Sequence, residues 1–226
     1  MEMFLRYFIT YGGYKTALLG LRNTLIIAIS GLVIGIILGS IVAAVKVAAT
    51  RSRVAKVFSY VGDVYTTVFR GTPIIVQLMI FYFIIFPKTG LSDLLQVVIV
   101  YGLNSGAYVA EIMRGGILSV DIGQTEAGRT LGLSYTTTMI KVVIPQAVKN
   151  VVPTLGNELI ALTKDTSVAG YVATMDLNAA FSAIAGATYD VLIPYLMLAA
   201  VYLILVLIMT FIIRFVERRL RKSERR

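Results

Sequence analysis

The sequence QTEAGRTLGLSYTTTMIKVVIP occupies residues 124 to 145 and lies between long apolar segments. Its charged residues, threonines and glycines make it too polar to lie within lipid. Gly132 permits a sharp reversal of the chain, and Ser134 is well placed to cap a following helix. The stretch therefore predicts two short helices, the first beginning near Ile122, that are joined at a glycine outside the membrane.

The composition of the whole chain places it in a membrane. Of its 226 residues, 58% are hydrophobic and 15% are charged, whereas soluble domains average about 45–50% apolar and about 25% charged residues. Uncharged segments of 23 residues run from 23 to 45 and from 191 to 213. A helix needs about 20 such residues to cross a bilayer core of about 30 Å. Both segments are predicted membrane crossings.

Composition also excludes several classes of function. Cysteine and histidine are both absent, which removes disulfides, thiolate nucleophiles and the commonest metal ligand. The nearest approach to a phosphate-binding loop, GGYKT at residues 12 to 16, lacks the glycine required before the lysine. We therefore expect no catalytic site, no metal and no cofactor bound by this chain.

Three further crossings are predicted between the two apolar segments. The second is broken at RGTP, residues 70 to 73, because Pro73 disfavours helix at the residue before it, and it continues to Phe86. The third spans about Leu94 to Met113 and the fourth about Val151 to Thr163. Together with the two apolar segments they predict an all-α integral membrane protein with five transmembrane helices.

The charged residues orient these crossings. Residues 46 to 56 contain four basic residues and no acid, and residues 214 to 226 contain seven basic residues and two acids. Basic loops face the cytoplasm, so the net charge of +9 indicates topology rather than a nucleic-acid partner. The segment between the fourth and fifth crossings is acidic. We predict that the N-terminus lies outside and the C-terminus in the cytoplasm.

Small residues recur four apart on one face of the first crossing, at Gly31, Gly35, Gly39 and Ala43. Such spacing lets helices approach closely in lipid. The pattern predicts either packing within the chain or a contact between subunits.

The order of Glu126-Ala127, Gly132 and Ile144-Pro145 resembles the EAA loop of binding-protein-dependent ABC importer permeases, with Gly128 in place of the third-position alanine. Three further stretches resemble the polar amino-acid permeases, the histidine, glutamine and arginine branch. These are RGTPIIVQL at 70–78, SGAYVAEIMRGGILSV at 105–120 and NELIALTKDTSV at 157–168. The resemblance covers residues 21 to 217.

The family resemblance implies a type I importer fold and a single permease domain over residues 1–226, with a cytoplasmic coupling loop at about 119–145 and a basic tail at 214–226. It implies ATP-driven import of polar amino acids across the cytoplasmic membrane of a prokaryote. The implied partners are two ABC ATPase subunits, which hold ATP and Mg, a second permease subunit, and an extracytoplasmic amino-acid-binding protein. We expect a homodimer, because binding-type and coupling-type residues all occur in one chain.

In this family the second short helix of the loop docks in a cleft of the ATPase. The residues expected to take part in coupling are Glu126, Ala127, Gly132, Ser134, Tyr135 and Met139.

Polar residues inside the predicted crossings are candidate substrate ligands, because ionisable groups in a membrane usually face a cavity or a partner. The carboxylate of Glu158 could pair with the ammonium of an amino acid, and Asn157 could bind its carboxylate. A buried glutamate also favours a basic amino acid as the substrate. The candidate set is Glu158, Asn157, Asn104, Ser105, Tyr108 and Gln77.

Each of these assignments has an alternative. Glu158 could pair with an internal arginine or with a second subunit, and the polar group around Asn104 could join helices to one another. Glu111 is expected to pair with Arg114, and Asp165 to cap the next helix. For the protein as a whole, the alternatives are a stand-alone secondary transporter or channel and a membrane scaffold without transport activity.

Overall fold

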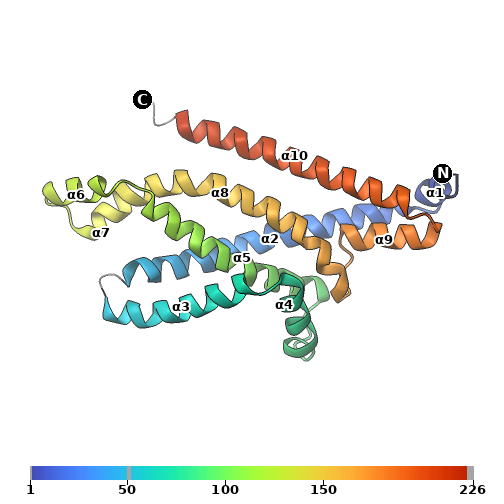
Figure 1. Ribbon diagram of the computed structural model, residues 1–226, viewed down its shortest axis with the longest axis horizontal. Helices are drawn as coiled ribbons and strands as arrows, with labels where there is room; N and C mark the ends of the chain where they lie inside the picture. The colour runs from blue at the N-terminus through green and yellow to red at the C-terminus, as the bar shows by residue number, and fades with distance from the viewer. Residues whose placement is uncertain (1, 50–51, 223–226) are drawn as a thin grey trace.

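A computed structural model of the protein describes residues 2–49 and 52–222, and these residues contain helices but no strand. Figure 1 shows an elongated bundle in which α2 (Gly13–Ala48), α5 (Asp93–Leu118) and α8 (Ile144–Asp165) follow the long axis. The remaining helices are α1 (Glu2–Leu5), η1 (Arg6–Thr10), α3 (Arg53–Gly71), α4 (Ile74–Ile80), η2 (Phe81–Ile85), α6 (Ile122–Thr130), α7 (Tyr135–Thr138), η3 (Met139–Val143), η4 (Thr166–Val172), α9 (Leu177–Thr188) and α10 (Leu192–Lys222).

Three of these helices, α2, α5 and α10, are long and apolar enough to cross a membrane. Two bent pairs also qualify if each counts as one crossing. They are α3 with residues 74–85, bent by 108°, and residues 135–172 with α9, bent by 55°. The described residues therefore allow between three and five crossings, and the five predicted from the sequence require both bent pairs to span.

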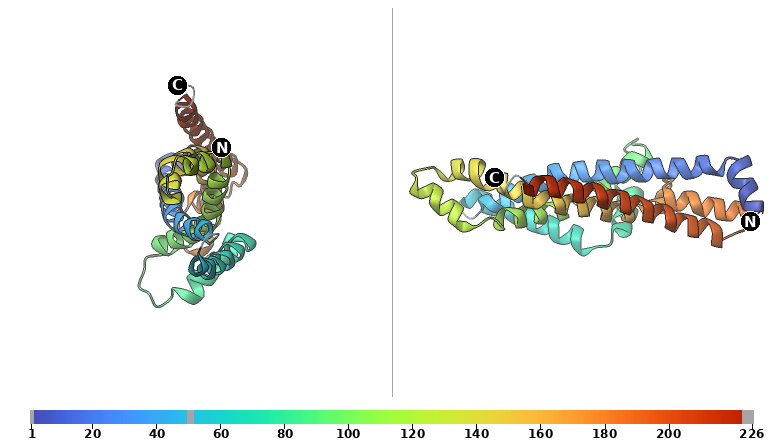
Figure 2. Two further views of the ribbon diagram at one scale, coloured as in Figure 1. Left: turned by 90° about the vertical axis from the view of Figure 1, so that its left-hand side faces the viewer. Right: turned by 90° about the horizontal axis from the view of Figure 1, so that it is seen from above.

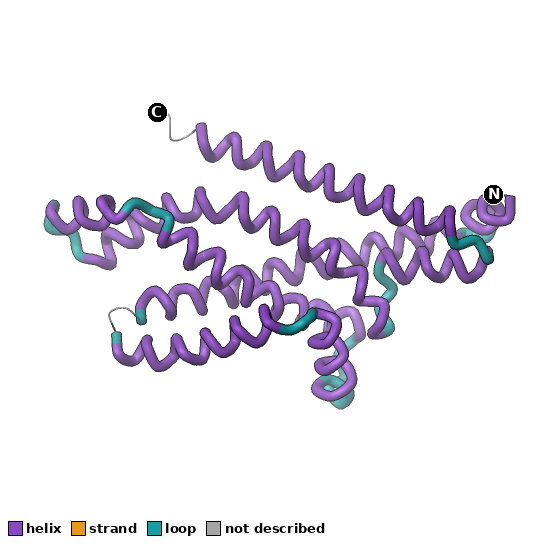
Figure 3. Tube along the Cα trace, viewed as in Figure 1, coloured by secondary structure: helices purple, strands orange, loops and turns teal. Residues whose placement is uncertain are grey.

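The predicted break at RGTP is confirmed. Thr72 is extended, with φ −121° and ψ 144°, and Pro73 precedes the first turn of α4. Figure 3 shows a short loop at this point, after which α4 turns away from the line of α3. The residue before a proline avoids the helical region, so the sequence itself dictates where the helix stops.

The small-residue face of α2 packs within the chain, against α5. A Cβ added at Gly35 would lie 2.6 Å from Oγ of Ser105, and one added at Gly39 would lie 2.7 Å from the backbone N of Ala110. Only glycine allows the two backbones to approach this closely. Of the two alternatives left by the sequence, the structure supports packing within the chain.

The two ends of the bundle carry different parts of the chain. In Figure 2 the hairpin formed by α6 and α7 lies at one end, with the last turns of α10 toward it, and α1 lies at the opposite end beside the start of α10. This arrangement agrees with the predicted orientation, in which the hairpin and the C-terminus share the cytoplasmic side. The N-terminal segment was not predicted to be structured, yet Phe4 is buried in a cluster with Leu177 and Phe181 of α9.

Candidate functional site

The polar hairpin reverses at the predicted glycine. At the end of α6, Leu133 N donates to Gly128 O at 3.0 Å and Gly132 N donates to Arg129 O at 3.0 Å. Gly132 has φ +76°, the left-handed conformation that this type of helix ending requires. Ser134 Oγ then accepts from Thr137 N at 3.2 Å, as predicted for a helix cap.

The second helix of the hairpin is longer than predicted. Instead of ending as a separate short helix, α7 continues through the π-helical turn η3 into α8. Pro145 has no N–H to donate, and it directly follows the π-helical turn as the second residue of α8. Ile144 N bonds to Met139 O across the wider π turn, so the backbone stays helical up to the proline.

The six predicted coupling residues point in two directions. Glu126, Ala127, Gly132 and Ser134 are exposed at the end of the bundle. Tyr135 and Met139 instead line a half-open cavity of about 360 Å³ that Lys46 and Arg114 also line. The coupling role itself stays a prediction. Two apolar side chains of the hairpin are strongly exposed, Ile122 at 74% and Leu131 at 79%.

Glu158, the main substrate candidate, meets Ser105 across the contact between α8 and α5. Ser105 is fully buried, and its Oγ donates to Oε1 of Glu158 at 3.2 Å. Glu158 is half-buried, and it forms no salt bridge within the described part of the chain. The alternative in which an internal arginine neutralises Glu158 therefore finds no support in the single chain.

Two other polar residues of α8 accompany Glu158. Asn157 is exposed beside it, and Asp165 is exposed at the end of the helix, seven residues or about two turns away on the same face. The prediction that Asp165 caps the next helix is wrong, because its side chain makes no capping bond. Asp165 itself is helical, with φ −65° and ψ −22°, whereas a capping residue must leave the helix.

Gln77 and Asn104 stabilise the break between α3 and α4. Gln77 Nε2 donates to the carbonyls of Phe69 at 2.8 Å and Thr72 at 3.0 Å, and Asn104 Nδ2 donates to Gln77 Oε1 at 3.0 Å. Broken helices in membranes need such partners for the backbone groups that they free. The contacts support the interhelical alternative, and a substrate role for these two residues stays a prediction.

Tyr108 lies on an exposed part of α5, one turn from Ser105. The guanidinium of Arg70 at the end of α3 stands over its ring, 5.4 Å from the ring centroid. This distance is typical of a cation–π contact. The ring of Tyr108 therefore contacts α3 in this conformation.

An ion network joins α2, α3 and α5 near the hairpin end. Lys46 Nζ lies 2.9 Å from Oδ1 of Asp63 and 2.8 Å from Oε1 of Glu111, and it donates to Thr66 at 3.0 Å. The other oxygen of Glu111 pairs with Arg114 at 2.9 Å. The predicted pair of Glu111 and Arg114 is thus confirmed within a larger network.

A second cavity, of about 430 Å³, lies between α5 and α8. Its polar lining includes Glu111 of α5, Ser119 directly after the end of α5, and Asn150 and Thr154 of α8. Asn150 Nδ2 donates to Ser119 Oγ at 3.0 Å at the hairpin end of this cavity. Thr154 lies one helical turn from Glu158, so the polar groups continue along both helices. We call the set Ser105, Glu111, Ser119, Asn150, Thr154 and Glu158 the polar lane.

Comparison with known proteins identifies the class of protein that has this architecture. Residues 31–222 match the family described as the binding-protein-dependent transport system inner membrane component. The chain belongs to this family. The permease is 39% identical over 213 residues to the arginine transport system permease protein ArtQ of Bacillus subtilis, covering 91% of this chain and 92% of the relative.

Other relatives carry different substrate names. The permease is 35% identical over 204 residues to the L-cystine transport system permease protein TcyB of Bacillus subtilis, covering 89% of this chain and 85% of the relative. Among solved structures, a chain from the crystal structure of an amino acid ABC transporter with histidines has a TM-score of 0.85 and 34% identity, covering 94% of this chain and 98% of that chain. A MetNI methionine ABC transporter chain, with a TM-score of 0.72 and 20% identity, shares the fold.

The sequence of the permease did not by itself indicate the ion network. Lys46 was assigned to a basic loop after the first crossing, but α2 extends to Ala48 and only 9% of the lysine side chain is exposed. Asp63 is the residue from which the network could have been predicted. It is an acid within an amphipathic segment beside a broken crossing, and such an acid needs a partner.

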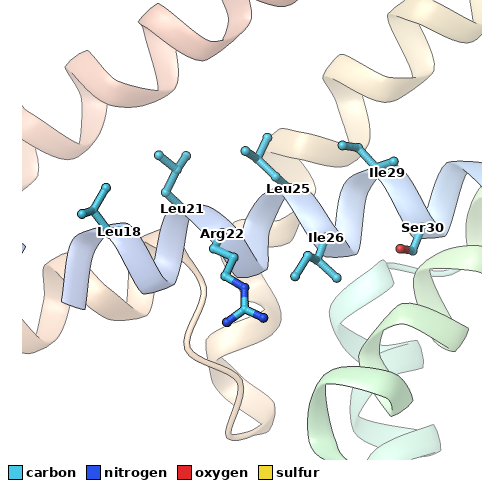
Figure 4. A pocket seen from close by; sticks show the side chains of 7 residues that line it. All are labelled: Leu18, Leu21, Arg22, Leu25, Ile26, Ile29 and Ser30. Atoms are coloured by element: carbon cyan, nitrogen blue, oxygen red, sulfur yellow. The ribbon is translucent and has the colours of Figure 1, made fainter. Parts of the chain in front are cut away.

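A third cavity of the permease lies along the N-terminal half of α2 and differs from the polar lane. Its lining is apolar apart from Arg22 and Ser30, and Figure 4 shows Arg22 pointing away from the side of the helix that carries Leu21 and Leu25. No acidic residue lines it. The polar lane is therefore the better candidate for an amino-acid path.

Proposed function

We propose that this permease is the membrane subunit of an ATP-driven importer that translocates cationic amino acids across the cytoplasmic membrane of a prokaryote. The observation that carries the proposal is the half-buried carboxylate of Glu158, which bonds to Ser105 and has no salt-bridge partner among the described residues. A carboxylate at membrane depth needs a cationic partner. The ammonium or guanidinium of a substrate supplies one.

The surroundings of Glu158 support a basic substrate. Asp165 provides a second carboxylate on the same face of α8, about 10 Å further along the helix axis. Named relatives include an arginine permease, and a similar transporter chain was solved with histidines. The α-ammonium common to all amino acids offers this carboxylate a cationic partner whatever the side chain of the substrate.

The polar lane supports assembly with a second copy of the permease. Asn150, Thr154 and Asn157 are exposed on helices that cross the membrane in this proposal. Lipid does not tolerate such groups, whereas a second permease subunit would cover them and complete the path. The homodimer has five crossings in each chain, with each N-terminus outside and each C-terminus in the cytoplasm.

The hairpin supports docking of a separate ATPase on each permease. It combines the exposed acid Glu126 with the exposed apolar side chains of Ile122 and Leu131. A polar segment with a few large apolar side chains is typical of a protein interface. ATP and Mg bind to the ATPase subunits, and an extracytoplasmic binding protein delivers the amino acid.

Reconstitution into proteoliposomes tests the proposal. The permease, its ATPase and its binding protein should take up labelled arginine only when ATP is present on the ATPase side. Glu158→Gln should lower arginine uptake at least about tenfold, which corresponds to about 1.4 kcal/mol, while the ATPase still copurifies. Asp121→Asn is the matched control, because asparagine caps a helix as well as aspartate.

Three results would each contradict a part of the proposal. Uptake by the permease alone, without ATPase or ATP, would support a stand-alone secondary transporter or channel. Full arginine uptake by Glu158→Gln would remove the substrate role of this carboxylate. An obligate second permease species in the active complex would exclude the homodimer.

A further inference from the structure

The polar lane contains two carboxylates with different electrostatic surroundings. Glu158 bonds to the Ser105 hydroxyl and has no salt bridge in the described chain. Glu111 lies further toward the hairpin and pairs through one oxygen with Lys46 at 2.8 Å and through the other with Arg114 at 2.9 Å. Glu158 can therefore still pair with a cation, whereas the charge of Glu111 is already neutralised.

Glu111 separates two cavities. It lines the cavity between α5 and α8 together with Thr154 and Asn150, which belong to the polar lane. Lys46 and Arg114 line the other cavity, beneath the hairpin. The two cations therefore reach Glu111 from the side away from the lane.

Lys46 is held firmly in this position. Its side chain is 9% exposed and has three partners, Asp63 at 2.9 Å, Thr66 at 3.0 Å and Glu111 at 2.8 Å. Asp63 and Glu111 come from different helices, α3 and α5, so the lysine is fixed from two sides.

A transport path must bind its cargo well enough to admit it and weakly enough to release it. An unpaired carboxylate near the cytoplasmic end would attract a cationic substrate strongly, because charges interact strongly where water is scarce. Such a carboxylate would slow release into the cytosol.

We infer that Lys46 and Arg114 neutralise Glu111 so that the cytoplasmic half of the polar lane releases cationic substrates, while the unpaired Glu158 receives them. Lys46 and Arg114 are positioning residues, which act through Glu111 and not by touching the substrate. The inference rests on the proposed function, because it requires a cationic amino acid to pass along the lane.

Lys46→Met in the complete importer tests the inference, because methionine keeps much of the side-chain length and removes the charge. In proteoliposomes, the turnover rate for arginine should fall about tenfold and the KM for arginine should fall with it, since slow release limits both. The complex should also retain more labelled arginine after gel filtration.

Adding Glu111→Gln to Lys46→Met should restore turnover and abolish retention. Lys56→Met, at an exposed position of α3, is the matched control.

A purely structural role for the network gives a different result. It predicts that Lys46→Met lowers turnover without lowering KM and without retaining arginine, and this outcome would overturn the inference. If Lys46→Met does not assemble with the ATPase, Arg114→Met carries the same test, because Arg114 is 42% exposed and its loss leaves Lys46 in place. Retention that persists after Glu111→Gln is added would also overturn it.

The two proposals fail in different ways. If the wild-type importer takes up no arginine with ATP, the proposed function is wrong and the inference falls with it. If the wild-type importer takes up arginine but Lys46→Met and Arg114→Met behave like the Lys56→Met control, only the inference is wrong.

Discussion

Asn104 on α5 donates from Nδ2 to Oε1 of Gln77 on α4, at 3.0 Å, across the break in the second predicted crossing. Gln77 in turn donates to the carbonyls that the break leaves free. The two amides connect the bent arm, which consists of α4 and η2, to the most buried helix of the bundle. The angle of 108° between α3 and this arm therefore depends on side chains as well as on Pro73.

Gln77→Leu should destabilise the permease by about 1–3 kcal/mol, because it leaves buried polar groups at the break without their donor. Thermal unfolding of the purified protein in detergent measures the effect as a lower Tm. Val76→Leu, at the exposed neighbouring position, should leave the Tm unchanged. An unchanged Tm for Gln77→Leu would mean that Pro73 alone maintains the break.

Glu126→Lys should weaken docking of the ATPase, and thereby lower transport, without unfolding the chain. It reverses an exposed charge on α6, and loss of a desolvated ion pair with the ATPase costs on the order of 2–5 kcal/mol. Uptake and substrate-stimulated ATP hydrolysis should fall together, and less ATPase should copurify. Gln124→Lys adds a single positive charge nearby, against the two-unit change at position 126, and it removes no acid, so it should have a smaller effect. Full uptake by Glu126→Lys would exclude the coupling role.

Gly132→Val should distort the hairpin, because a β-branched residue at φ +76° is strained by about 1–3 kcal/mol. Space does not limit this position, since a Cβ there would meet nothing within 4 Å. Gly132→Asn should therefore retain most activity, because asparagine tolerates the left-handed conformation. Copurification of the ATPase measures the effect, and equal loss in both variants would show that backbone strain is not the cause.

Gly39→Leu should disrupt the contact between α2 and α5. Even its Cβ would lie 2.7 Å from the backbone N of Ala110, and overpacking typically costs about 1–3 kcal/mol. The amount of monodisperse protein recovered in detergent should fall sharply. Ile37→Leu, on the exposed side of the same helix, should give a normal yield. A normal yield of Gly39→Leu would indicate that α2 can move away from α5 at low cost.

The local structure of the hairpin and of the break could be predicted because single residues determine it. Pro73 prevents helix at Thr72, Gly132 allows a left-handed turn, and the Ser134 side chain reaches the backbone three residues later. The resemblance to a permease family likewise depended on short stretches of sequence and is confirmed by the match over residues 31–222. These features need only neighbours in the chain.

The sequence by itself determined an all-helical membrane protein and the position of its polar hairpin, since composition and spacing along the chain carry that information. It also singled out Glu158 as a candidate ligand of a cationic substrate, which stays a prediction. Only the tertiary structure decided which polar groups meet. Ser105 and Glu158 are 53 positions apart, and Lys46 and Glu111 are 65 apart. The packing of α2, α5 and α8 brings these pairs together, because glycines let the α2 and α5 backbones approach and helix rotation sets which side chains face each other. That packing is why Glu111 has cationic partners and Glu158 has no salt bridge among the described residues.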